Sequence, residues 1–103
     1  MDSRHLHGVL LALILAIAAS TPAAAMTAHD WYEMGLDSFA EGDYIEATEA
    51  FDRAVKSDPT VADYWNGLGG ALESMGDAAA AIRAYDMAIE LKPEDPRPWN
   101  NRG

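Results

Sequence analysis

The chain has 103 residues, of which 50% are apolar, 9% aromatic and 23% charged, a composition typical of a folded domain and not of a disordered tail. Its formal net charge of −10 argues against nucleic-acid binding, because proteins of that class carry basic patches that neutralise phosphate. The sequence contains no cysteine, which excludes a disulfide framework, a thiolate zinc site and a cysteine nucleophile.

Residues 1–25 have the features of a secretory signal peptide. A short polar start is followed by an uninterrupted apolar run over residues 9–19, and Ala23-Ala24-Ala25 offers the small residues that a signal peptidase accepts. We therefore expect cleavage after Ala25 and an exported protein, periplasmic or secreted. The alternative is an uncleaved membrane anchor, although a spanning helix needs about 20 apolar residues and this segment reaches that length only by including Pro22.

An internal repeat occupies the rest of the chain. Trp31, Trp65 and Trp99 are spaced by 34 residues, and Gly35 and Gly69 follow at the same offset. Residues 28–61 align on residues 62–95 with ten identities. A fixed period of this length predicts an array of structural repeats in which each unit packs on the next.

Each unit is predicted to form two antiparallel helices of about 14 residues, because apolar and small residues recur at helical spacing on either side of a Gly-Asp pair. In the first unit Gly42-Asp43 marks the turn between the helices, and Asp43 with Glu46 fits a capping box. Pro59 closes the second helix. Gly35, opposite Ala47, is expected to let the two helix backbones approach closely.

Residues 96–103 begin a third unit. Asp95-Pro96 suits a helix start, and the helix that begins there contains Trp99. With two full units and a short third one, we expect Tyr85 and Ile89 to lack part of their cover. Either the sequence is the N-terminal piece of a longer array, or its exposed end pairs with another copy or a partner.

The second unit resembles a tetratricopeptide repeat, and the first unit matches the same pattern. The residues that carry the resemblance are Trp65, Leu68, Gly69, Gly76, Asp77, Ala81, Tyr85, Ala88 and Pro93. The resemblance implies an all-α fold, an α-solenoid of tandem helix hairpins, with repeats at 28–61 and 62–95 and the start of a truncated third at 96–103. It also implies protein–protein binding without catalysis.

In that family the first helix of each unit lines a groove that binds peptides. Transferred by position, the resemblance implies these groove residues: Tyr32, Leu36, Phe39, Asp63, Asn66, Gly70 and Glu73. The groove would be aromatic and apolar at one end and acidic at the other, which suits a partner with an apolar anchor and basic charge. The alternative for Tyr32 and Phe39 is that they only cover packing surface.

Family members that grip acidic tails of chaperones use groove lysines and asparagines. Here Tyr32 and Leu36 occupy the positions where the first unit would supply a lysine and an asparagine. Among the clamp positions only Arg97 is basic, so the sequence predicts no such clamp. The glycines at Gly67, Gly69 and Gly70 lie within a predicted helix, where they could admit the backbone of a partner.

We expect no catalysis, no cofactor and no metal site, because His29 stands alone and no serine lies in a nucleophile motif. The predicted function is an exported scaffold for protein–protein interactions. The alternatives are a self-associating structural module that forms a homo-oligomer, or an accessory region of a longer envelope protein or enzyme. A membrane enters only if the leader stays uncleaved.

Overall fold

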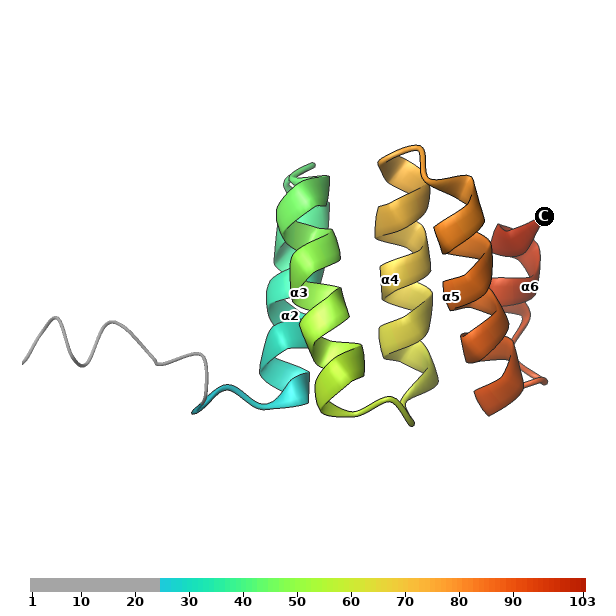
Figure 1. Ribbon diagram of the computed structural model, residues 1–103, viewed down its shortest axis with the longest axis horizontal. Helices are drawn as coiled ribbons and strands as arrows, with labels where there is room; N and C mark the ends of the chain where they lie inside the picture. The colour runs from blue at the N-terminus through green and yellow to red at the C-terminus, as the bar shows by residue number, and fades with distance from the viewer. Residues whose placement is uncertain (1–24) are drawn as a thin grey trace, which may run out of the picture.

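The computed structural model of the protein describes residues 25–103, and these residues form five helices and no strand (Figure 1). The predicted leader lies outside the described residues, apart from Ala25. The helices are α2 (Ala28–Ala40), α3 (Tyr44–Ser57), α4 (Ala62–Ser74), α5 (Ala78–Leu91) and α6 (Pro96–Arg102). The predicted all-α fold of tandem helix hairpins is confirmed.

The two hairpins pack in series along the molecule (Figure 1). Helices α2 and α3 form the first hairpin, α4 and α5 form the second, and α6 continues the array on the far side of α5. Helix α4 contacts both α2 and α3, and α6 contacts both α5 and α4. The first helices of successive units, α2, α4 and α6, therefore lie along one side, which we call the first-helix surface.

The turns within the hairpins depend on glycine at a left-handed position. Gly42 and Gly76 have φ values of 82° and 87°, which side chains rarely adopt. After Gly42 the Asp43 N–H donates to the Ser38 carbonyl at 2.9 Å, and the Asp43 carboxylate accepts from the Glu46 N–H at 3.1 Å. The predicted capping box at Asp43 is therefore only half formed, because its backbone N–H already serves the end of α2.

The helical glycines accommodate aromatic rings. A Cβ atom added to Gly35 or Gly67 would lie within 2.9 Å of the Phe51 ring, and one added to Gly69 would lie 2.5 Å from the Tyr85 ring. At Gly35 and Gly69 the space that the missing side chain leaves is filled by a ring from the paired helix. The Phe51 ring lies between α2 and α4, so it joins the two hairpins.

The core consists of small residues around these rings. Ala47, Ala54 and Ala81 are at most 2% exposed. Tyr85 is 1% exposed, so the prediction that it lacks cover was wrong, while Ile89 is half-buried. Gly69 leaves room for the Tyr85 ring, and even the short helix α6 packs on α5. Two and a quarter repeats are thus enough to bury the central aromatic residue of the second hairpin.

Candidate functional site

A hollow of about 220 Å³ opens on the first-helix surface between α2 and α4. Four predicted groove residues border it, namely Leu36, Phe39, Asn66 and Gly70. Leu36 is 41% and Phe39 37% exposed, so two large apolar side chains face solvent at its rim. We call this space the groove hollow; its lining is completed by Phe51, Gly67 and Asn101.

Gly70 differs from the other helical glycines in its surroundings. A Cβ at Gly70 would meet only the Tyr85 hydroxyl at 3.8 Å and the Phe39 ring at 4.0 Å, which is ordinary van der Waals contact. Gly67, in contrast, lies against the Phe51 ring, so packing within the chain already favours glycine there. Packing within the described chain therefore explains the glycine at Gly67 and leaves the glycine at Gly70 unexplained.

Tyr32 lies beside the groove hollow and packs into the core. Its ring centroid is 5.0 Å from that of Tyr64 and 5.8 Å from that of Phe51. Burial raises the pKa of the Tyr32 hydroxyl, and the charge of Asp63 adds to the shift. Tyr32 thus covers packing surface, as the alternative interpretation has it, whereas Phe39 keeps an exposed ring whose edge contact is with Tyr44 at 5.2 Å.

The acidic end of the predicted groove is partly neutralised within the chain. The Arg97 guanidinium donates to Asp63 at 2.6 Å and to Asp95 at 2.7 Å. Hydrogen bonds from Arg97 lower the pKa of the Asp95 carboxyl to about 2. Arg97, at the same position one repeat later, already pairs with Asp63, and the role of Asp63 in binding a partner stays a prediction.

Glu73 also has a partner within the second hairpin. The Tyr85 hydroxyl donates to the Glu73 carboxylate at 3.4 Å, a long hydrogen bond. Burial, followed by the nearby Glu73 charge, raises the pKa of Tyr85 to about 12. Of the seven predicted groove residues, the structure brings four around one hollow, whereas Tyr32, Asp63 and Glu73 are not part of its lining.

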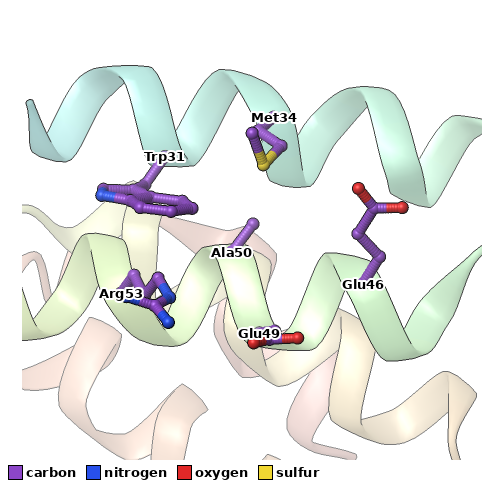
Figure 2. Close-up of a pocket in the computed structure, with 6 residues that line it drawn as sticks. All are labelled: Trp31, Met34, Glu46, Glu49, Ala50 and Arg53. Atoms are coloured by element: carbon purple, nitrogen blue, oxygen red, sulfur yellow. The ribbon is translucent and has the colours of Figure 1, made fainter. Parts of the chain in front are cut away.

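A second hollow, of about 210 Å³, lies between α2 and α3 on the outer side of the first hairpin (Figure 2). Trp31 and Met34 point from α2 toward α3, and Ala50 lies between them on α3 (Figure 2). Three charged side chains of α3 complete its lining: Glu46, Glu49 and Arg53. We call this space the end hollow.

Within residues 25–103, no three histidine, aspartate or glutamate side chains gather in a way that could hold a metal ion. None of the helices that the structure describes combines the length and apolar character needed to cross a membrane. The two hollows and the exposed apolar side chains are therefore the features from which a function can be argued.

The sequence pattern of the tetratricopeptide repeat family matches residues 32–96, which is more than half of the chain. The protein belongs to the tetratricopeptide repeat family. A search of curated proteins gives no match.

Several solved structures are similar to this chain. MamA protein aligns with a TM-score of 0.71 and 30% identity over 74% of this chain and 42% of MamA. The first TPR of Spaghetti (RPAP3), bound to an HSP90 peptide, aligns with a TM-score of 0.70 and 21% identity, over 74% of this chain and 62% of the Spaghetti chain. The CopN–Scc3 complex aligns with a TM-score of 0.70 and 21% identity, over 81% of this chain and 56% of the matched chain. This chain thus spans about half the length of the three matched chains.

Sequence reasoning about this tetratricopeptide repeat protein missed part of each hollow. Asn101 of α6 borders the groove hollow and donates to Asn66 at 3.5 Å. Its place could have been found, because it lies 34 residues after Gly67. The end hollow carries no such signal, since it exists only because no helix of the described chain covers α2 on its outer side.

Proposed function

We propose that the protein is an exported scaffold that binds an extended segment of a partner protein on the first-helix surface, without catalysing a reaction. The observation that carries this proposal is Gly70. Glycine inside a helix costs about 1 kcal/mol relative to alanine. At Gly70 no packing contact offsets that cost, and the open space above it is continuous with the exposed Leu36 and Phe39 side chains.

The chemistry of the groove hollow supports a neutral, partly apolar guest. An apolar side chain of the partner inserts between Leu36 and Phe39, while its main chain passes over Gly70. Asn66 and Asn101 supply amide groups at the edge that can hydrogen-bond a peptide backbone. The apolar anchor is thus the main determinant, and basic charge on the partner contributes less here because Asp63 is paired with Arg97.

Two structural neighbours support the class of function. The first TPR of Spaghetti (RPAP3) is bound to the HSP90 peptide SRMEEVD, and CopN–Scc3 is a complex. The acidic HSP90 peptide is a poor candidate for this chain, because Arg97, the cation expected near the groove, already pairs with Asp63 and Asp95. We therefore propose a partner without an acidic tail.

Peptides selected from a random library against the purified protein test this proposal. We expect them to share an apolar residue, and we expect Gly70→Ala to weaken binding about tenfold or more, since a methyl group fills the space that the guest needs. Ser57→Ala, at the exposed end of α3, is the control and should bind as the natural protein does. Equal binding by Gly70→Ala would contradict the proposal.

The proposal of export rests on the leader pattern in residues 1–25. Mass spectrometry of the protein from cells that express the full chain measures its N-terminus. A mature chain that begins at Met26 in the extracytoplasmic fraction is the expected result. A chain that keeps residues 1–25 and stays in the cytoplasmic fraction would contradict export, and one retained in the membrane fraction would favour the anchor.

A further inference from the structure

The end hollow is built differently from the corresponding face of the second hairpin. Thirty-four residues after Met34 stands Leu68, which is 7% exposed, and α4, the helix that carries it, packs against α3. No helix in residues 25–103 packs on the matching side of α2, and Met34 stays half-buried. The end hollow is therefore an apolar space that the described chain leaves open.

Its charged rim belongs to the first hairpin alone. Glu46 and Glu49 lie three residues apart on α3, so they share one face of the helix, whereas the matching positions in α5 are Ala80 and Arg83. The packing scheme of the repeat therefore does not require these carboxylates. Figure 2 shows Glu46 directed from α3 toward α2, across one end of the hollow.

The rim holds one cation, Arg53, beside its two carboxylates, so its net charge is negative. No salt bridge to either Glu46 or Glu49 occurs within the described part of the chain; Arg53 instead stacks over the Trp31 ring, 4.9 Å from its centroid. A hydrogen bond with Asp43 and the charges of nearby carboxylates raise the pKa of Glu46, a sign of excess negative charge at this edge.

The indole of Trp31 also differs from those of the other tryptophans. Trp65 Nε1 donates to the Pro59 carbonyl at 2.8 Å, and Trp99 Nε1 donates to the Pro93 carbonyl at 3.0 Å. Trp31 Nε1 has no acceptor among residues 25–103. Trp31 therefore presents an apolar ring to the end hollow.

We propose that the end hollow binds a lysine or arginine side chain from a basic segment of a partner protein. The methylene groups of the guest lie on Met34 and the edge of Trp31, and its charged end pairs with Glu46 and Glu49. This surface is separate from the groove hollow, so the protein joins two partners, one on the first-helix surface and one on the end of the array.

A second copy of the chain is a poorer occupant than a basic partner. The chain carries a net charge of −10, so two copies repel each other at long range. Three of its cations, Lys56, Arg97 and Arg102, already form ion pairs with carboxylates of the same chain. The charge complement of the end hollow is therefore a basic segment from another protein.

The three indole N–H signals of the ¹⁵N-labelled protein provide the test. Acetyl-Leu-Lys-Leu-amide should shift the Trp31 signal and leave those of Trp65 and Trp99 in place. The same tripeptide with norleucine in the centre, which has no charge, should produce no shift at equal concentration. An equal shift with norleucine, or equal shifts of all three indoles, would overturn the proposal.

Matched variants locate the cation. Glu46→Gln/Glu49→Gln should weaken binding of the lysine tripeptide about two- to thirtyfold, since two exposed ion pairs are lost. Glu33→Gln/Glu41→Gln makes the same charge change outside the hollow and should have less than half that effect. All four side chains are exposed, and circular dichroism verifies that the variants stay folded.

Two further measurements distinguish a basic partner from a second copy of the chain at the end hollow, and this proposal from the groove proposal. Gly70→Ala should leave the Trp31 response unchanged, so failure here is distinguishable from failure of the groove proposal. A Trp31 shift that grows with protein concentration alone would identify a second copy as the occupant and overturn the assignment to a basic partner. Equal loss of binding in both pairs of glutamine variants would overturn it as well.

Discussion

In the first hairpin the Phe51 ring lies between Gly35 of α2 and Gly67 of α4, whereas in the second hairpin Tyr85 lies against Gly69 of its own partner helix. The two aromatic residues are equivalent in the repeat, yet Phe51 connects two hairpins and Tyr85 mainly closes one. Residues at the same position of the repeat can therefore make different packing contacts, depending on the helix that follows them in the array.

The outward positions of the hairpins differ far more than the packed ones. The first hairpin presents Leu36 and Phe39 to the groove, where the second has Gly70 and Glu73. Because α2 and α4 lie side by side, the large residues of one unit stand next to the glycine of the other and form a hollow that neither hairpin has alone. Binding surface in this protein thus arises from the difference between its repeats.

The largest expected effect is that of Phe51→Ala. Truncating a buried phenylalanine costs about 3–5 kcal/mol. That is comparable with the roughly 3–5 kcal/mol that one core of this size supplies. We therefore expect loss of cooperative urea unfolding at 25 °C, followed by circular dichroism.

The control for this prediction is Tyr85→Phe, which removes only the long hydrogen bond to Glu73 and should cost about 1 kcal/mol or less. A Phe51→Ala protein that still unfolds cooperatively, with less than about 1 kcal/mol lost, would show that Phe51 does not join the hairpins.

A smaller effect is expected from Gly69→Ala. The added methyl group would lie 2.5 Å from the Tyr85 ring, and overpacking of this kind costs about 1–3 kcal/mol. The clash outweighs the gain of about 1 kcal/mol in helix propensity. The midpoint of urea unfolding should therefore fall. In a Tyr85→Leu background the same Gly69→Ala change should cost less, and an equal cost in both backgrounds would contradict the cause.

The smallest effect concerns α6 at low pH. Hydrogen bonds from Arg97 lower the pKa of Asp95 from the usual 3.8 to about 2 in the folded protein. The contribution of this contact is therefore complete above pH 3.8 and is lost as the pH falls toward 2. The Trp99 indole signal, bonded to the Pro93 carbonyl, should begin to report release of α6 in that interval. Asp95→Asn removes the titrating group, so the Trp99 signal of this variant should not change in that interval, and an identical pH profile would contradict the assignment.

Most of the fold could be predicted from the sequence, because the 34-residue period repeats both the helix pattern and the Gly-Asp turns. Asp43 and Asp77 cap their helices as the pattern indicates. The role of each glycine could not be predicted, since residue identity does not say whether a ring from another helix lies against it. The second half of the capping box failed for a related reason, namely competition for the Asp43 N–H.

The sequence predicted which residues meet in the groove hollow, but it did not reveal the ion pair that Asp63 forms with Arg97. The position of each unit in the array brings Leu36, Phe39, Asn66 and Gly70 together, as the transferred pattern implies. The pairing of Asp63 with Arg97 was missed, although opposite charges 34 residues apart are a signal that the period itself offers. The end hollow depends on side-chain conformations and on an uncovered helix face, and no sequence pattern encodes either of these.

The central claim is that Gly70 has no packing role, so that its missing side chain serves a partner. Urea unfolding of Gly70→Ala tests this claim most directly. Because the added methyl group meets nothing closer than 3.8 Å, we predict a protein more stable by about 0.5–1 kcal/mol, in contrast to the loss predicted for Gly69→Ala. A Gly70→Ala protein that is less stable than the natural one would contradict the account.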